Sequence, residues 1–328
     1  MNAIVPITNP AWPCQVEIHE TEAEWLEARK TGIGASEVAS VFGCGYANTS
    51  PITVWAAKTG GPRMEFDEAT IRRMNRGHKL EPVIASEFTE ETGLACFDPG
   101  PYTIYRSNTV PWLFATLDRW CIDPDFGAIP VELKAVHGRF RNDWDEQEEP
   151  PLKYMVQCQT QMAVTGAKAC YLVGLIGGDE IVVRLIERND RFIEAMTAKL
   201  ALFWGYVVNH LMPPVDESEA TKAMLGMIYP KDTGAEVSLP IDFIELDREL
   251  LTLKDQRKTI ETRIDKIENL IKAEMKTATR GCLPVGSFTW KEQTRTTIDA
   301  DSLRAELPEI AERFSKVSSF RVLRRSSK

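Results

Sequence analysis

Two short stretches in the middle of the chain have the apolar pattern of neighbouring β-strands. Residues 113–122 are mostly apolar and aromatic with one acid inside them, Asp118, and residues 129–136 alternate between apolar and polar side chains. Residues 123–127 separate them and read Asp-Pro-Asp-Phe-Gly, in which proline presets φ and glycine permits a positive φ. The pattern therefore predicts a β-hairpin.

This hairpin is expected to bring two acids and a lysine together. Because side chains alternate along a strand, Glu132 and Lys134 share one face of the second strand and lie near Asp118 on the first. Two carboxylates forced together repel unless a cation joins them, and hard oxygen ligands suit Mg²⁺ or Mn²⁺. A surface ion pair between strands is the alternative interpretation. The opposite face is expected to enter a core through Val131, Leu133 and Ala135.

Helical periods flank the hairpin on both sides. Thr21-Glu22-Ala23-Glu24 is a capping box that predicts a helix running to about Arg29. Pro82 is expected to kink a long helix or to start a new one, which would aim Glu81 inward. Other predicted elements are helices at residues 36–42, 51–59, 67–92, 152–164 and 189–211, and a second hairpin at residues 170–176 and 180–187.

The pattern changes after Pro214. Leucine and isoleucine recur every seven residues between Asp242 and Ala278, with Arg257 as the polar exception, which is typical of a coiled coil. Such a helix pairs with another chain, packs on its own body or forms a stalk. The expected organisation is an irregular lead-in (1–20), a main domain (21–214), a linker (215–241), a coiled-coil helix (242–278) and a small α/β extension with a basic tail (279–328). Within this extension we expect strands at 287–298 and 317–323 and a helix at 302–306.

Composition narrows the class of protein. The chain has 328 residues, of which 43% are hydrophobic and 27% charged, as is ordinary for a globular protein in water. A net charge of −9 argues against general coating of nucleic acid but permits a local basic channel. Seven scattered cysteines without C-x-x-C predict a reducing cytoplasm and give no zinc spacing. The longest apolar run, residues 200–208, is too short to cross a membrane.

Two segments carry candidate contacts to phosphate groups. Arg29 precedes a glycine-containing loop that enters a helix near Ser36, where backbone N–H groups and a guanidinium suit an anion. A plain connection between two helices is the alternative. Residues 137–151 are expected to form a mobile loop over the site, in which Arg139 and Arg141 face either a nucleic-acid backbone or only solvent.

The helix predicted at residues 152–164 has a polar stripe. Tyr154, Gln157 and Gln161 are spaced three and four residues apart, so they share one face. That face looks either into a cleft or into water.

Several motifs occur in order between Glu24 and Pro213. They are Trp25-x-x-x-Arg29 followed by Ser36, Gly77-x-x-x-Glu81, Asp118 with Glu132-x-Lys134, Tyr154-x-x-Gln157-x-Gln159, and Val164-Thr165-Gly166. In this order they resemble the YqaJ viral recombinase family, which is related to phage lambda exonuclease, and its PD-(D/E)XK nuclease core. Leu117 stands where that core has proline, a departure that removes no ligand.

The resemblance implies an α/β fold of the restriction-endonuclease type, with a central mixed sheet flanked by helices. It also implies roles for individual residues. Asp118, Glu132 and the Leu133 carbonyl would hold two Mg²⁺ ions, for which Mn²⁺ could substitute. Glu81 would complete the site. Lys134, supported by Gln157, would position the attacking water. The residues expected to hold a 5′-phosphate or DNA are Arg29, Ser36, Thr116, Arg139, Arg141, Tyr154 and Gln161.

The expected activity is metal-dependent 5′→3′ degradation of double-stranded DNA from its ends, used in phage recombination in the cytoplasm of a bacterial host. The resemblance further implies a ring-shaped homotrimer and a partner single-strand annealing protein. An endonuclease or nickase is the alternative within the same class. A DNA-end-binding protein without activity is the alternative from another class.

Overall fold

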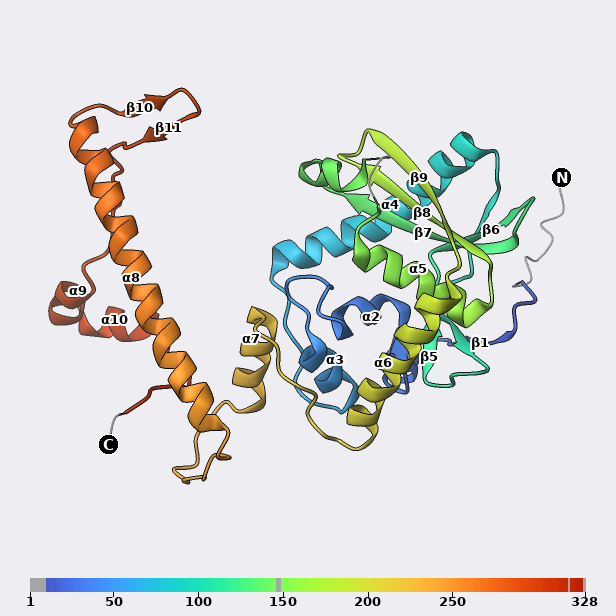
Figure 1. The fold of residues 1–328 in the computed structure, drawn as a ribbon, viewed down its shortest axis with the longest axis horizontal. Coiled ribbons are helices and arrows are strands. Elements are labelled where there is room, and N and C mark those ends of the chain that lie inside the picture. Colours follow the sequence, from blue (N-terminus) through green and yellow to red (C-terminus); the bar gives the residue numbers. More distant parts are fainter. Residues whose placement is uncertain (1–9, 146–148, 318, 327–328) are drawn as a thin grey trace. The chain divides into compact units, whose positions relative to one another are not determined.

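The computed structural model describes residues 10–145, 149–317 and 319–326. The chain divides into two compact units, residues Met1–Pro230 and Lys231–Lys328. Figure 1 shows both units, and each is described by itself below. Within the described ranges, every helix is too short or too polar to span a lipid bilayer.

A five-stranded mixed sheet carries the predicted hairpin in the first unit. Its order is β3-β6-β7-β8-β9, with β7 and β8 parallel and the other neighbours antiparallel. A tight turn joins β6 to β7, whereas the parallel pair needs a crossover, which helix α5 provides. The strands are β3 (Cys96–Phe97), β6 (Arg119–Asp123), β7 (Gly127–Val136), β8 (Ala169–Ile176) and β9 (Glu180–Glu187).

A four-stranded sheet of order β1-β4-β5-β2 lies in the same unit. Strand β1 (Cys14–Ile18) pairs with β4 (Thr103–Ser107), so the expectation of an irregular lead-in is wrong for these residues. The nearby prolines hide a strand whose partner lies far away in sequence. Residues 1–9 of the lead-in are outside the described residues. The other strands are β2 (Ile33–Gly34) and β5 (Leu113–Ala115).

The predicted strand at residues 113–122 is in fact two strands. β5 ends at Ala115 in one sheet and β6 begins at Arg119 in the other, so residues 116–118 pass between the sheets. The apolar run continues across the break because both strands are buried, which hides the break from the sequence pattern. Asp118 therefore lies between two sheets and not within one strand.

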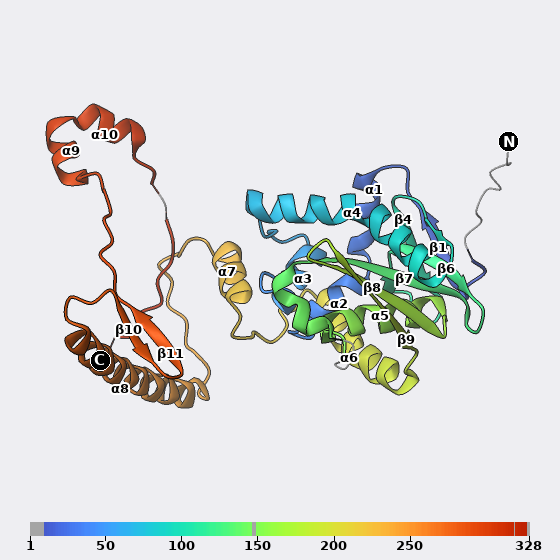
Figure 2. The ribbon, with the colours of Figure 1, turned by 90° about the horizontal axis from the view of Figure 1, so that it is seen from above.

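Helices cover both faces of the five-stranded sheet, as expected. Figure 2 shows α4 on one face and α5 and α6 on the other. Phe88 of α4 packs against Tyr171 of β8, with ring centroids 5.0 Å apart. The helices are α1 (Glu22–Lys30), α2 (Ala35–Val41), α3 (Pro51–Lys58), α4 (Glu68–Thr92), α5 (Leu152–Thr165) and α6 (Asp190–Val208).

Helix α4 runs unbroken through Pro82, which settles the choice between one helix and two. The Asp67 side chain caps its start, and Gly93 ends it with a left-handed φ of 73° that glycine adopts without strain. The second predicted hairpin and the helix capped by Asn189 are also present.

The loop after β7, which was expected to be mobile, begins with a short helix. Residues Gly138–Trp144 form the short 3₁₀ helix η1, and Trp144 is buried against Gly174 of β8. A Cβ atom at Gly174 would lie 2.5 Å from the Trp144 ring, so glycine is required for this contact. Residues 146–148 of the same loop are outside the described residues.

The first unit extends beyond the boundary expected at Pro214. Helix α7 (Glu219–Ile228) lies in the segment that the sequence pattern assigned to a linker. Met224 of this helix is completely buried against Ile52 and Ala56 of α3. The linker expectation is therefore wrong, because a short amphipathic helix finds its partner more than 150 residues earlier in the chain.

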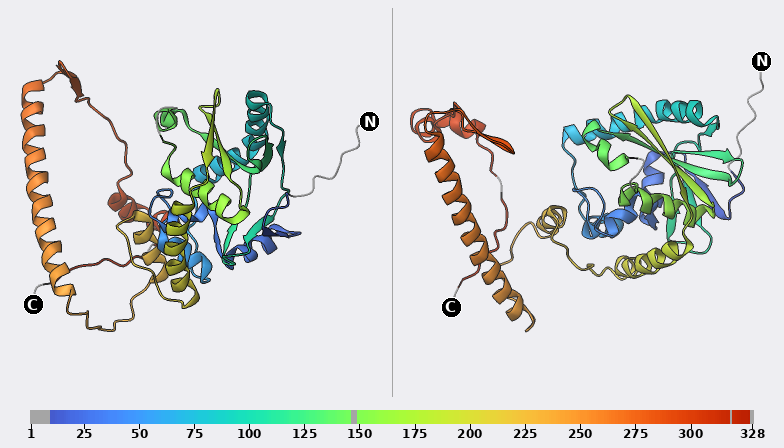
Figure 3. Two further views of the ribbon diagram at one scale, coloured as in Figure 1. Left: turned by 45° about the vertical axis from the view of Figure 1, so that its right-hand side comes forward. Right: turned by 45° about the horizontal axis from the view of Figure 1, so that its top comes forward.

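The second unit is built on one long helix, α8, visible in both views of Figure 3. The predicted helices at the coiled-coil stretch and near residue 302 are present. The strand expected at 287–298 ends at Thr289, and the described residues of 317–323 form no strand, because neither stretch has a partner to extend the ladder. The elements are α8 (Phe243–Met275), β10 (Arg280–Leu283), β11 (Gly286–Thr289), α9 (Ala300–Glu306) and α10 (Pro308–Phe314).

Candidate active site

The break before β6 and the middle of β7 bring the predicted acids and lysine together. Asp118 accepts a hydrogen bond at Oδ2 from the Leu133 backbone N–H, 2.9 Å away. The Glu132 side chain has no exposed surface and forms an ion pair with the Lys134 ammonium. The Asp118 carboxylate is close enough to Glu132 for its charge to act on that carboxyl group. The three side chains thus form one cluster.

The residues of β7 that were predicted to be buried are only partly so. Val131 and Leu133 are buried, as alternation predicts. Ala135 is exposed, contrary to the prediction, although Val136 at the end of the strand is buried.

Helix α5 holds the Glu132 carboxylate from the opposite side. Gln157 donates to Oε1 at 2.7 Å, and Gln161 donates to Oε2 at 2.5 Å. The Gln161 carbonyl oxygen accepts from the Cys170 thiol at 3.5 Å, which fixes the orientation of the amide. The polar stripe on this helix therefore faces the interior, and Gln161, which is completely buried, contacts Glu132 instead of a surface open to DNA.

Burial and mutual repulsion shift the pKa values of the cluster. Burial raises the pKa of the Glu132 carboxyl to about 7, and the neighbouring Asp118 charge adds to this rise. Burial also raises the pKa of Asp118, although the Lys134 charge opposes the shift. For the Lys134 ammonium, burial lowers the pKa, but the charges of Glu132 and Asp118 outweigh it and raise this pKa above its usual value. Two acids that resist ionising side by side are ready to accept a cation.

The residues present fit a magnesium ion. The described part of the chain contains no group of three or more His, Cys, Asp and Glu side chains arranged to hold a metal. Two carboxylates with free positions for water and phosphate oxygens are nevertheless a donor set that Mg²⁺ takes in nucleotide-processing sites. Asp118 and Glu132 supply this pair, and the Leu133 carbonyl is the adjacent backbone oxygen.

Glu81 lies near this pair without joining it directly. Its carboxylate oxygen lies 2.9 Å from Nδ1 of His78, which is one turn earlier on the same helix. Its negative charge nonetheless contributes to the raised pKa of Asp118.

The expected phosphate anchor is assembled around Arg29. Its guanidinium lies over the Trp25 ring at 4.7 Å and the Phe114 ring at 5.5 Å, which fixes the planar group in place. One nitrogen donates to the Ser36 hydroxyl at 3.5 Å. Thr116 follows β5, the strand that carries Phe114, and lies two residues before Asp118.

A glutamate already occupies the backbone end of this anchor. Glu37 accepts from the Gly34 N–H and from the Lys58 ammonium, both at 2.7 Å, and lies 3.9 Å from Arg29. Lys58 also donates to the Arg29 carbonyl at 2.6 Å. Burial lowers the pKa of Lys58, and Glu37 opposes this shift. The anchor thus contains two cations and one resident anion.

Comparison with known proteins settles the family. A family model described as the YqaJ-like viral recombinase domain matches residues 24–168. The uncharacterized protein YqaJ of Bacillus subtilis strain 168 is 30% identical over 305 residues, which are 91% of this chain and 92% of that protein. This chain belongs to the YqaJ-like viral recombinase family. The prediction from its motifs is confirmed.

Part of this chain also resembles solved structures. An alkaline exonuclease from Laribacter hongkongensis gives a TM-score of 0.46 at 22% identity, covering 57% of this chain and 93% of that one. A phage-related exonuclease from Haemophilus somnus 129PT gives a TM-score of 0.42 at 12% identity, covering 55% of this chain and 94% of that one.

A small pocket in this YqaJ-like domain joins the anchor to the acid cluster. Ser36 and Gln157 line the same pocket, together with Tyr46 and Lys153. The Lys153 ammonium lies 4.8 Å from the centre of the exposed Tyr46 ring and 4.9 Å from that of Tyr154. Neither Arg29 nor the acids line this pocket, so it links the two groups only through Ser36, which contacts Arg29, and Gln157, which contacts Glu132.

The two loop arginines lie outside this site. Arg141 forms ion pairs with Asp179 and Glu180 on the second hairpin. Arg139 stacks on Phe140 at 4.6 Å, and both arginines are exposed. They are available to a nucleic-acid backbone but do not contact the acid cluster.

Several residues of the site were missed in the sequence. Glu37 and Lys58 contact Arg29, and Tyr46 and Lys153 line the joining pocket. Glu37 had a local signal, because a glutamate at the third position of a helix often accepts from the N–H of the residue that caps it, which here is Gly34. The other three come from segments whose proximity only the fold determines.

Proposed function

We propose that this protein is a Mg²⁺-dependent nuclease that degrades double-stranded DNA from its ends in the 5′→3′ direction, during phage recombination inside a bacterial host cell. The observation that carries the proposal is the buried Asp118–Glu132 pair with Lys134 at its edge. Membership of the viral recombinase family supports a role on DNA.

The residues of the cluster have separable tasks in this proposal. The Leu133 N–H orients Asp118, and Gln157 and Gln161 orient Glu132, so both carboxylates are fixed before an ion or DNA arrives. A bound divalent ion supplies Lewis-acid polarisation of the phosphate and a more acidic water. Lys134 keeps its proton and stabilises negative charge that develops on the phosphate oxygens.

The anchor would determine the polarity of digestion. Arg29 presents a rigid fork of donors matched to phosphate oxygens, and the exposed Ser36 hydroxyl lies beside it. Because Ser36 and Gln157 line one pocket, a 5′-phosphate held at Ser36 would set which phosphodiester reaches the acids. This arrangement supports exonuclease action with 5′→3′ polarity.

One observation favours a second candidate, an endonuclease or nickase. The Glu37 carboxylate already accepts from the Gly34 N–H at the end of the anchor and lies 3.9 Å from Arg29. Its negative charge opposes a dianionic terminal phosphate. If that opposition dominates, the acid cluster cuts internal bonds without measuring from an end.

The experiment compares linear duplexes with a 5′-phosphate, linear duplexes with a 5′-hydroxyl, nicked circles and closed circles, each with Mg²⁺, Mn²⁺ or a chelator. The exonuclease proposal predicts loss of linear DNA, faster with a 5′-phosphate, and survival of closed circles. Cutting of closed circles at the rate of linear DNA would favour the endonuclease. Binding to ends without any cleavage would leave the non-catalytic DNA-end-binding alternative.

The proposal extends to the assembly. A ring-shaped homotrimer would enclose the duplex during digestion, and a single-strand annealing protein would receive the exposed strand. Light scattering of the purified protein tests the first, and co-purification with a co-expressed annealing protein tests the second. A strictly monomeric protein that digests linear DNA would refute the ring.

A further inference from the structure

Helix α8 carries an apolar stripe that the folded chain leaves exposed. Leu246 and Leu253 are each 53% exposed, and Ile260 is 59% exposed. The complete stripe is Leu246, Leu250, Leu253, Ile260, Ile264 and Ile267. An apolar stripe of this length on a helix, interrupted only at Arg257, marks a surface that another element covers.

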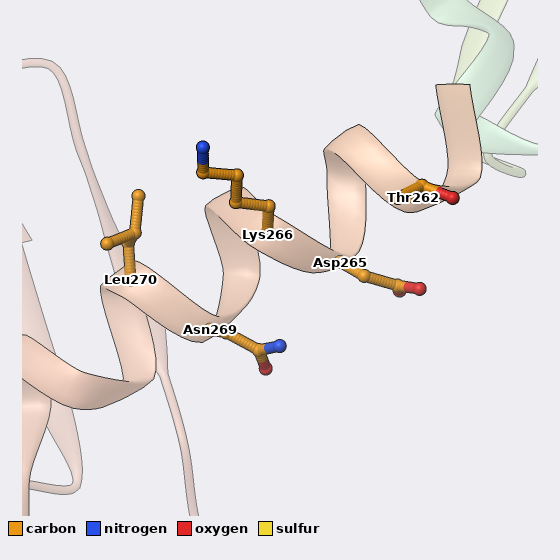
Figure 4. A pocket seen from close by; sticks show the side chains of 5 residues that line it. All are labelled: Thr262, Asp265, Lys266, Asn269 and Leu270. Carbon is orange, nitrogen blue, oxygen red and sulfur yellow. The ribbon is translucent and has the colours of Figure 1, made fainter. Parts of the chain in front are cut away.

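The opposite side of α8 is polar. Figure 4 shows Thr262, Asp265, Lys266 and Asn269, which line a shallow depression together with Leu270. None of these residues belongs to the stripe. The helix is therefore two-sided, and its apolar side has the three-and-four spacing of a coiled-coil seam.

The spacing assigns heptad positions. Leu250 and Ile264 occupy position a, and Leu253, Ile260 and Ile267 occupy position d. The residues that flank the seam then follow: Glu249 and Arg263 at position g, and Lys254 and Glu268 at position e.

These flanking charges are complementary to a second copy of the same helix. In a parallel, in-register pair, position g of one helix faces position e of the next heptad on its neighbour. Glu249 then faces Lys254, and Arg263 faces Glu268, so both contacts join opposite charges. An antiparallel pair that sets Leu250 level with Ile267 would instead join one repelling pair, Asp247 with Glu268, and one attracting pair, Lys254 with Glu261, so it lacks the uniform match of the parallel pair.

We propose that α8 forms a parallel, in-register coiled coil with α8 of other copies of this chain. Isoleucine stands at both positions of the seam, at Ile264 and at Ile260 and Ile267, which favours three strands over two. Parallel in-register helices are related by rotation about their common axis, so the assembly closes on itself. This proposal rests on α8 alone and holds whatever the nuclease unit does.

The polar exception in the seam fits the same assembly. Arg257 occupies position a and forms an ion pair with Glu261 at 3.4 Å, which draws its charge toward the edge of the helix. A single polar residue at position a fixes the register of a coiled coil while lowering its stability. The C-terminal segment contacts the helix elsewhere, through Arg325 and Asp247, and leaves the four flanking charges accessible.

The test is disulfide cross-linking of the full-length protein. Leu253→Cys is made in a Cys282→Ser background, because Cys282 is the exposed one of the seven cysteines. Mild oxidation should link Leu253→Cys chains into pairs on a non-reducing gel. The matched control is Thr262→Cys on the polar side, which should link severalfold less. Equal linking at both positions, or none at position 253 with helicity unchanged by circular dichroism, would overturn the proposal.

A charge exchange tests the register independently of the cysteine position. In the Leu253→Cys protein, Lys254→Glu places two acids opposite each other and should lower the cross-linked yield severalfold. Adding Glu249→Lys restores opposite charges at the same contact and should recover the yield. A double exchange that stays as low as the single one would overturn the parallel, in-register arrangement, since only that arrangement pairs these two positions between identical chains.

Discussion

Replacing Gln161 with leucine removes one hydrogen bond from a completely buried carboxylate and changes little else in shape. Gln161 donates to Glu132 Oε2 at 2.5 Å, and neither side chain has any exposed surface, so no water replaces the lost donor. Because the Gln161 hydrogen bond opposes the rise in the pKa of Glu132, its loss should raise that pKa further. The variant should then bind Mg²⁺ more weakly, since the ion must displace a more tightly held proton.

The size of the expected change in Mg²⁺ affinity follows from the type of hydrogen bond that is lost. A hydrogen bond to a charged group contributes about 1.5–3 kcal/mol, which corresponds to roughly a 10- to 150-fold change in an equilibrium constant. The Mg²⁺ concentration for half-maximal digestion of linear duplex should therefore rise by about this factor. Thermal melting over a Mg²⁺ titration gives the same constant without turnover, because an ion that binds only the folded state raises the melting temperature.

Gln159→Leu is the matched control. Gln159 is also buried on α5, but it donates to the Glu187 carbonyl at 2.8 Å and accepts from the Asn189 N–H at 3.0 Å, away from the acids. It should lower the melting temperature without moving the Mg²⁺ midpoint. The reasoning fails if the two leucine variants have the same Mg²⁺ midpoint.

Further predictions concern the cluster, the domain boundary and pH. Lys134→Ala should slow cleavage about 10²–10³-fold at saturating Mg²⁺ in single-turnover assays. Met224→Ala should lower the free energy of unfolding by about 2–5 kcal/mol in denaturant titrations, and a chain ending at residue 230 should fold where one ending at 214 does not. Because the pKa of Glu132 is raised to about 7, the metal-free protein should lose stability as pH rises through that value, and Mg²⁺ should raise the melting temperature more at about pH 8 than at about pH 6.

The elements predicted correctly from sequence are those whose signals are local. The Thr21 cap of α1, the Asp67 and Gly93 ends of α4, and the turn between β6 and β7 each depend on a few adjacent residues. Strand β1 and helix α7 were missed because each is stabilised by a partner distant in sequence.

The residues of the site also fall into those with a local sequence signal and those that only the fold brings together. Strand alternation was enough to place Glu132 and Lys134 together, and helical spacing put Gln157 and Gln161 on one face. The contacts of Glu37 with Lys58 and of Tyr46 with Lys153 join different elements, so no periodicity reveals them. The interior position of Gln161 likewise required the packing of α5 against the sheet.

Digestion of linear 5′-phosphorylated duplex by the wild-type protein and by Asp118→Asn, each with Mg²⁺, tests the central claim most directly. Asparagine keeps the shape and an oxygen that accepts from the Leu133 N–H, so the fold should persist while the negative charge is lost. The account predicts shortening of the duplex from its ends by the wild type and none by a folded Asp118→Asn. Equal digestion by both proteins would contradict the assignment of this carboxylate pair as the catalytic centre.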